Sequence, residues 1–262
     1  MRILKLALLI LLIYLCAAAY LFFVQRSLLY FPPPPNHHGY PEESFLFEEA
    51  RVQVIVLNKG HQNAILYFGG NAEAVERNAP SFMKNFPNHM LYLMQYRGYG
   101  NSTGEPTEAN LYADSLIVFD KIKQRHHSIS VIGRSLGSGV ATYLAANRKI
   151  HKLALITPYD SIEAMAQSLF PLFPMSILLQ DKYNALAHAQ QIKAPTLLLI
   201  AENDQTIPLA HSQKLANAFA YFQALSVIIP DSNHNNISYH PLYITQLQQF
   251  INTPYPPPKN NQ

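Results

Sequence analysis

A serine lies between two glycines in the stretch GRSLG (133–137), directly after an apolar run and directly before a helix-like segment. The spacing G-x-S-x-G in a strand–turn–helix setting is typical of a nucleophile elbow, in which a sharp turn exposes the serine hydroxyl. A free serine hydroxyl is a poor nucleophile, so it needs a histidine base that a carboxylate orients. The motif therefore predicts a nucleophile at Ser135 if an acid and a histidine follow at suitable positions.

An acid and a histidine do follow Ser135, in the order that such a site requires. Asp204 comes shortly after the apolar run 196–201, and His234 follows the last apolar run, 225–229. Ligands of an open parallel sheet bind at the carboxyl ends of its strands, which is where both residues are expected. We therefore predict a catalytic triad in which His234 takes the proton of Ser135 and Asp204 orients the imidazole.

Other acids and histidines fit these roles less well. Glu202 follows its strand too closely, and Asp231 is expected in a turn after a proline. Asp160 is expected in a turn or as a helix N-cap, with Ser161 as the other cap candidate. The remaining histidines mostly fall in polar loops or on helix faces, where we expect them to be solvated: His37, His38, His126, His127, His151, His188, His211 and His240.

Attack on a carbonyl also requires N–H donors for the negative charge that develops on its oxygen. The backbone N–H of Leu136, directly after Ser135, is expected to be one donor. The segment GGN (69–71) follows the apolar run 64–68 and offers the other. We assign this second donor to the N–H of Asn71, with Gly70 as the alternative; otherwise the segment is an ordinary turn between a strand and a helix.

The elements that must position these residues alternate between short apolar runs and longer helical patterns. Several runs are apolar throughout, which is typical of parallel strands covered on both faces. Such alternation predicts an α/β fold with a mostly parallel central sheet and helices on both of its faces. The expected strands are 52–57, 64–68, 90–95, 129–133, 153–157, 196–201 and 225–229, and the expected helices are 107–125, 136–148, 208–220 and 240–252.

The N-terminus contains a long segment without charge, residues 6–24. In a helix this segment reaches about 28 Å, close to the thickness of the hydrocarbon core of a bilayer. A cleaved signal peptide ending near 17–19 is one alternative, but the apolar run continues past that site. A lipoprotein signal is disfavoured because a bulky leucine precedes Cys16. We therefore predict an uncleaved transmembrane helix at the N-terminus.

The charges on either side of the apolar segment predict how the chain is oriented in the membrane. Arg2 and Lys5 precede the apolar segment and Arg26 follows it, so the positive-inside tendency predicts a cytoplasmic N-terminus and a catalytic domain on the outer, periplasmic or lumenal, side. We expect an anchor at 1–27, a catalytic domain at 28–253 and a polar tail at 254–262. Within the domain, the insertion 158–194 is expected to be either a small lid or a packed helix pair.

Composition excludes several classes of function. The net charge is only +3, and no run of five or more Lys and Arg occurs, which disfavours nucleic acid as a partner. The stretch RGYGNSTGE (97–105) fits neither a dinucleotide motif nor a phosphate loop, and we expect it to support the active-site face. No His and Cys pattern typical of a metal site occurs, so neither a metal nor another cofactor is expected.

The chain resembles the α/β-hydrolase superfamily, specifically the compact membrane-anchored serine hydrolases related to the α/β-hydrolase-domain protein depalmitoylases. The resemblance implies an α/β-hydrolase fold and a serine hydrolase with the triad Ser135, Asp204 and His234. Many relatives carry His-Gly-Asn before the oxyanion loop, whereas Gly69 replaces the histidine here. The motifs that carry the resemblance are SLLYFP, LYFGGNAE, YRGYGNSTGEPTEANLYAD, VIGRSLGSGVA, LITPYDSI, APTLLLIAENDQTIP and SNHNNI.

These observations predict a serine hydrolase that cleaves carboxylic esters or thioesters through an acyl-enzyme intermediate. The substrate is expected to be a small molecule or a lipid with an acyl chain. A peptidase or amidase with the same triad is one alternative. A membrane-tethered binding protein that lacks turnover is another, but the presence of all three triad residues argues against it.

Overall fold

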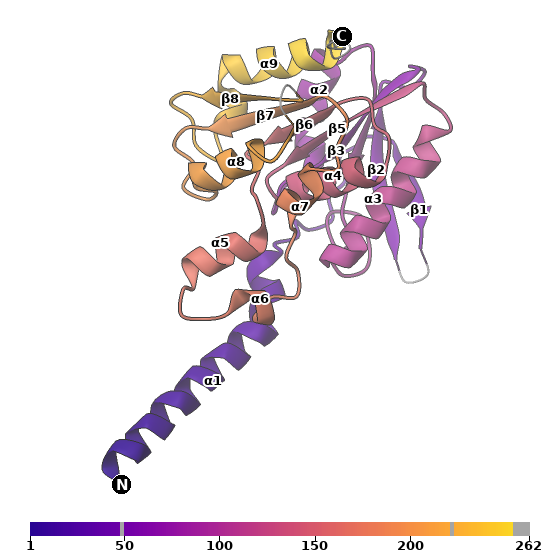
Figure 1. Cartoon of the computed structure of the whole chain (residues 1–262). Coiled ribbons are helices and arrows are strands. Elements are labelled where there is room, and N and C mark those ends of the chain that lie inside the picture. Colours follow the sequence, from indigo (N-terminus) through magenta and orange to yellow (C-terminus); the bar gives the residue numbers. More distant parts are fainter. Residues whose placement is uncertain (48–49, 221–222, 254–262) are drawn as a thin grey trace.

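An eight-stranded sheet in the order β1-β2-β4-β3-β5-β6-β7-β8 forms the centre of the chain (Figure 1). The computed structural model describes residues 1–47, 50–220 and 223–253, so the expected polar tail lies outside the described residues. The strands are β1 (Glu42–Leu46), β2 (Arg51–Leu57), β3 (Asn63–Phe68), β4 (Met90–Met94), β5 (Ser128–Arg134), β6 (Leu153–Ile156), β7 (Thr196–Ala201) and β8 (Ala224–Ile229).

The sheet is mostly parallel, as predicted. Among the described residues, β1 pairs with β2 and β2 with β4 antiparallel, and the strands from β4 to β8 pair parallel. All predicted strands are present. The sequence did not indicate β1, because this edge strand buries a single residue, Phe45, and so leaves no apolar run.

Helices cover both faces of the sheet and form two apolar core layers. One layer includes side chains of α3, α4, α7 and α8, and the other includes side chains of α2 and α9. The bounds of these helices are α2 (Ala79–Asn85), α3 (Glu108–Lys123), α4 (Leu136–Asn147), α7 (Ala185–Ala189), α8 (Leu209–Ala216) and α9 (Pro241–Asn252), with short 3-10 helices at Val75–Asn78 and Ile237–Tyr239.

The N-terminal helix α1 (Arg2–Leu29) extends away from this body (Figure 1). None of its residues is buried, and it is long and apolar enough to cross a membrane. The helix ends two residues beyond the expected end of the anchor. Directly after it, Tyr30 is only 5% exposed, and its hydroxyl lies 2.8 Å from that of Tyr183. The end of α1 is therefore fixed to the core.

The insertion 158–194 forms α5 (Ile162–Leu169), α6 (Met175–Leu178) and α7. Helices α5 and α6 lie outside the body next to α1, whereas α7 packs against α4 (Figure 1). The first part of the insertion is a projecting helix pair, and its last helix belongs to the core.

A buried lysine joins the end of α9 to the sheet. Lys152, just before β6, is 1% exposed, and its ammonium group donates to the carbonyls of Phe250, Ile251 and Thr253. Burial lowers the pKa of this lysine. These carbonyls lie at the end of a helix, where backbone acceptors lack partners within the helix, so a buried donor stabilises them.

Replacing Lys152 by methionine keeps the apolar stem and leaves these carbonyls without their donor. We expect Lys152→Met to lower the free energy of unfolding by about 1–3 kcal/mol. Lys149→Met, at an exposed position, is the matched control and should change it by less than about 0.5 kcal/mol. Chemical denaturation of the detergent-solubilised chain measures both, and equal effects would contradict this role of Lys152.

Candidate active site

Ser135 lies in the turn between β5 and α4 and has a backbone φ of +49°. Such a conformation is strained for a residue with a side chain and persists only where the surroundings hold it. A Cβ atom at Gly137 would lie 2.2 Å from the carbonyl oxygen of Phe68, and one at Gly133 would lie 2.3 Å from the oxygen of Gly137. The two glycines of the G-x-S-x-G motif therefore allow backbone segments to approach closely, and the turn has the strand–turn–helix arrangement predicted for the elbow.

The structure brings the three predicted residues into one hydrogen-bonded chain. His234 Nε2 lies 2.9 Å from Ser135 Oγ, and His234 Nδ1 lies 2.8 Å from Asp204 Oδ2. An ionised carboxylate can only accept hydrogen bonds, so the imidazole donates from Nδ1 and accepts the serine hydroxyl at Nε2. In this arrangement Nε2 is free to receive the proton of Ser135.

Asp204 is held by its own loop. The residue is 9% exposed, and its Oδ1 accepts from the backbone N–H groups of Thr206 (2.9 Å) and Ile207 (2.8 Å). One carboxylate oxygen thus fixes the loop after β7, while the other faces His234. This division of roles keeps the carboxylate oriented toward the imidazole.

The segment after β3 lies beside the elbow. Asn71 and Leu136 line the same cavity as Ser135. The N–H of Gly70, the alternative donor, already donates to Glu73 Oε2 at 2.6 Å. This bond favours Asn71 over Gly70 as the second donor.

The side chain of Asn71 contacts the end of α1, a role that the sequence did not indicate. Its Oδ1 accepts from the N–H of Phe31 (2.9 Å) and from the hydroxyl of Tyr99 (2.8 Å), and its Nδ2 donates to the carbonyl of Leu29. The loop next to Ser135 is therefore tied to the N-terminal helix on one side and to the loop after β4 on the other.

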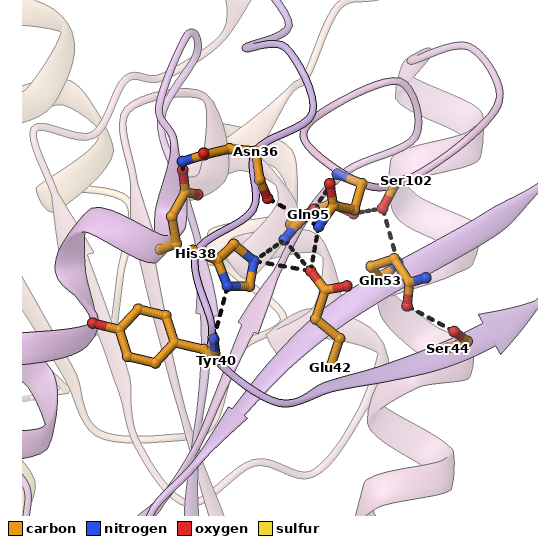
Figure 2. Close-up of polar contacts among 10 residues, drawn as sticks. Asn36, His38, Tyr40, Glu42, Ser44, Gln53, Gln95 and Ser102 are labelled. Carbon is orange, nitrogen blue, oxygen red and sulfur yellow. Dashed lines mark hydrogen bonds and ion pairs between the residues drawn. The ribbon is translucent and has the colours of Figure 1, made fainter.

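A polar network supports the loop that carries Tyr99 (Figure 2). Gln95 Nε2 donates to Glu42 Oε1 at 2.9 Å, and His38 Nε2 lies 3.0 Å from the same oxygen. Ser102 donates its hydroxyl to the carbonyl of Gln95 at 2.8 Å. The chain that follows α1 and the stretch 97–105 thus support each other, consistent with the role predicted for that stretch.

Glu73 and Arg134 form the charged centre of the site. Their side chains are 3.7 Å apart, and Arg134 also donates to the carbonyl of His234 at 3.2 Å. Burial alone would lower the pKa of Arg134, but the carboxylate of Glu73 keeps it above its ordinary value. Burial and Glu73 together raise the pKa of Tyr67, whose hydroxyl donates to Glu73 at 2.5 Å. No sequence pattern indicated this pair, although Glu73 and Arg134 each lie close in the chain to a predicted site residue.

Two cavities meet at Ser135. An apolar cavity of ≈ 330 Å³ lies toward α1, α5 and α6, and a second cavity of ≈ 660 Å³ has polar walls that include Arg77, Arg134 and Tyr239. His234 lines the polar cavity and not the apolar one. In the described part of the chain, no three His, Cys, Asp or Glu side chains gather as metal ligands would.

Of the two candidates for a helix cap, Ser161 caps α5, because its hydroxyl accepts from Ala164 N–H. Asp160 is 1% exposed and contacts His211 Nδ1 (2.8 Å) and Lys214 Nζ (2.9 Å). Burial alone would raise the pKa of Asp160, but these two partners hold it below its ordinary value.

The expectation that the remaining histidines are solvated is wrong for some of them. The side chain of His38 is 7% exposed and that of His211 is 15% exposed. His126 is 9% exposed and lies 2.8 Å from the hydroxyl of Tyr92. Local sequence polarity did not reveal the partners of His126 and His211, because Tyr92 and Asp160 come from distant parts of the chain, whereas His38 contacts Glu42 only four residues further on. In contrast, Asp231 does lie in a turn, with φ +50°.

Comparison with known proteins shows that the chain is similar to hydrolases. The serine hydrolase (FSH1) family matches residues 37–234. The α/β hydrolase domain-containing protein aho-3 of Caenorhabditis elegans is 26% identical over 196 residues, which are 71% of this chain and 57% of that protein. Lysophosphatidylserine lipase ABHD12 of Xenopus tropicalis is 34% identical over 150 residues, which are 50% of this chain and 39% of that protein.

The chain spans about half the length of the first curated relatives it matches. Among solved structures, Est1E from Butyrivibrio proteoclasticus with bound ferulic acid has a TM-score of 0.68 at 15% identity, covering 80% of this chain and 97% of that one. This likeness shows the α/β-hydrolase fold. Because the family match extends over most of the chain, the protein belongs to the serine hydrolase (FSH1) family of α/β hydrolases and resembles the ABHD proteins.

Proposed function

We propose that the protein is a membrane-bound serine hydrolase that cleaves carboxylic esters or thioesters. The observation that carries this proposal is the hydrogen-bonded chain from Ser135 through His234 to Asp204, in which Ser135 lines an apolar cavity. Relatives named as lipases support an acyl ester as the substrate.

The reaction follows from this geometry. His234 Nε2 takes the hydroxyl proton as Ser135 Oγ bonds to the carbonyl carbon of the substrate. The N–H groups of Asn71 and Leu136 stabilise the negative charge on the carbonyl oxygen. The bond to the leaving group then breaks as His234 returns the proton to the departing alcohol or thiol. Water repeats these steps on the acyl-enzyme, which releases the carboxylic acid and restores Ser135.

We assign each end of the substrate to one of the two cavities. His234 must protonate the leaving group, and it lines the polar cavity, so the leaving group belongs there. The acyl chain then occupies the apolar cavity, whose walls are side chains such as Leu21, Met165 and Leu169. A substrate with an apolar acyl chain and a polar leaving group matches both cavities.

We propose that α1 spans the membrane with its N-terminus in the cytoplasm and the catalytic domain on the outer side. Arg2 and Lys5 at the start of α1 support this orientation, and Arg26 at its end is paired with Asp181 at 3.1 Å. The proposed division into an anchor at 1–27 and a catalytic domain at 28–253 places Tyr30 in the domain core, in agreement with its burial.

Loss of the nucleophile tests the proposal directly. Ser135→Ala should abolish labelling by a fluorophosphonate probe and lower ester hydrolysis by about a thousandfold or more, because the acyl-enzyme cannot form. Ser168→Ala, at an exposed serine of α5, is the control and should retain labelling. Labelling of Ser135→Ala at the level of the parent chain would refute Ser135 as the nucleophile.

A bulkier wall should shorten the acyl chain that the site accepts. Ala166→Phe narrows the apolar cavity, so kcat/KM for a dodecanoyl ester should fall by about tenfold or more, while a butyryl ester is hydrolysed as before. The control is Ala187→Phe at an exposed position of α7. An equal loss for both esters, or faster cleavage of the matching amide, would count against this assignment.

The Asn71 side chain should matter for turnover because it holds the proposed donor loop. Asn71→Ala removes the bonds to Leu29, Phe31 and Tyr99, so kcat should fall by about ten- to a hundredfold with a smaller change in KM. Asn147→Ala, an exposed residue at the end of α4, is the control. An unchanged kcat in a folded Asn71→Ala protein would contradict the role.

A further inference from the structure

One face of α1 is in contact with the projecting part of the insertion. The residues of α1 that are partly rather than fully exposed recur every three or four positions, which places them along one side of the helix. The remaining residues of α1 are exposed. This partly buried stripe comprises Tyr14, Ala17, Ala18, Leu21, Val24, Gln25 and Leu29.

Near the middle of α1, Tyr14 contacts the loop between α5 and α6. Its hydroxyl donates to the carbonyl of Leu172 at 3.0 Å, and its ring stacks on that of Phe173 with centroids 5.0 Å apart. This contact is far from the sheet, as the position of α6 beside α1 also shows (Figure 1).

Near the end of α1, polar side chains contact the chain after α6. Gln25 Nε2 donates to the carbonyl of Leu178 at 3.1 Å, and Gln25 Oε1 accepts from the N–H of Gln180 at 2.6 Å. Arg26 lies 3.1 Å from Asp181. The insertion is therefore attached to α1 at two levels, so that α1, α5 and α6 form one unit.

The distance between these two levels gives the depth of the insertion. Tyr14 precedes Arg26 by twelve residues, which corresponds to about 18 Å along a helix. Tyr14 also lies in the middle of the uncharged stretch 6–24. If α1 spans a bilayer, Leu172 beside Tyr14 lies within the hydrocarbon rather than at the surface.

The chemistry of the insertion suits that depth. Residues 164–180 contain no charged side chain, whereas Glu163 and Asp181 flank them. Large apolar side chains face outward, with Leu169 74%, Leu172 80% and Ile177 79% exposed. Exposed apolar clusters of this kind mark a surface that contacts another apolar phase.

The backbone of this segment also finds partners within the protein, as hydrocarbon requires. Gln167 Oε1 accepts from the N–H of Met175, and the N–H groups of Phe170 and Phe173 donate to nearby carbonyls. Proline occupies positions 171 and 174 and has no N–H to satisfy. Together with the bond from Tyr14 to Leu172, these contacts reduce the cost of removing the segment from water.

We propose that residues 164–180, here called the cap, are embedded in the outer leaflet of the bilayer beside α1, and that the apolar cavity is entered from the hydrocarbon. Leu21 and Leu28 of α1, Met165 and Leu169 of the cap, and Ser135 all line this cavity. An acyl chain of a membrane lipid then reaches Ser135 without crossing water. Embedding rests on α1 spanning the membrane, and the use of the entrance rests on the proposed function.

Depth-dependent fluorescence quenching tests the position of the cap. In a Cys16→Ser background, which removes the only cysteine, Leu172→Cys and Ile177→Cys are labelled with a nitrobenzoxadiazole dye in phosphatidylcholine vesicles. Leu225→Cys is the matched control, because Leu225 is 55% exposed on β8. Phosphatidylcholine with a nitroxide on its acyl chain should quench the cap labels at least twofold more than the control, and iodide in the water should do the reverse.

Equal quenching of the cap and control labels by both agents would overturn the proposal. Fluorophosphonate labelling of Ser135 in the same vesicles reports the proposed function separately, since it requires no membrane substrate. Labelled Ser135 with a water-exposed cap refutes the embedding alone. Quenching of the cap by lipid without labelling of Ser135 supports the embedding and refutes the proposed function.

A variant with a more polar cap tests whether the substrate enters through the bilayer. The double variant Leu172→Asn and Ile177→Asn changes side chains that do not line the cavity. It should lower hydrolysis of a long-chain ester dissolved in the vesicle at least fivefold and leave that of a soluble butyryl ester unchanged. Leu225→Asn should affect neither, and a parallel loss for both esters in the double variant would contradict entry through the bilayer.

Discussion

The active site depends on the close approach of the first turn of α4 to the end of β3. Only glycine fits at position 137, because a Cβ atom there would overlap the carbonyl oxygens of Phe68 and Gly69. This approach brings Ser135 and the N–H of Leu136 next to the loop that carries Asn71. Ser135 itself has a positive φ in the same turn, a conformation that persists only where the surroundings hold it.

Electrostatic contacts extend this arrangement outward from the elbow. Glu73 accepts from Gly70 N–H and Tyr67 and pairs with Arg134, which in turn donates to the carbonyl of His234. The loops that carry the proposed second oxyanion donor and the histidine are therefore connected through one ion pair. Both side chains are largely buried, so the electrostatic attraction between them is stronger than in an ion pair on the surface.

The N-terminal helix is connected to the same centre. Its last carbonyl, at Leu29, accepts from Asn71, and Tyr30 continues directly into the core beside Tyr183. The helix also lines the apolar cavity together with α5 and α6. A segment that composition describes only as a membrane anchor thus contributes to the site, and the proposed position of the cap extends this contribution into the bilayer.

The sequence alone predicted the strands β2 to β8, the helices α3, α4, α8 and α9 and the turn at Ser135, because apolar runs and loop positions are local patterns. It also predicted that Asp204 and His234 follow the ends of strands, and the structure brings both into one hydrogen-bonded chain with Ser135. The sequence could not determine β1, which buries one residue, or the partners of His126, Asp160 and Lys152, which come from distant segments. The tertiary structure decided that the N–H of Gly70 already donates to Glu73 and that the side chain of Asn71 contacts the end of α1. The contacts of Asn71 with α1 join residues far apart in the chain, and only packing of the whole fold brings them together.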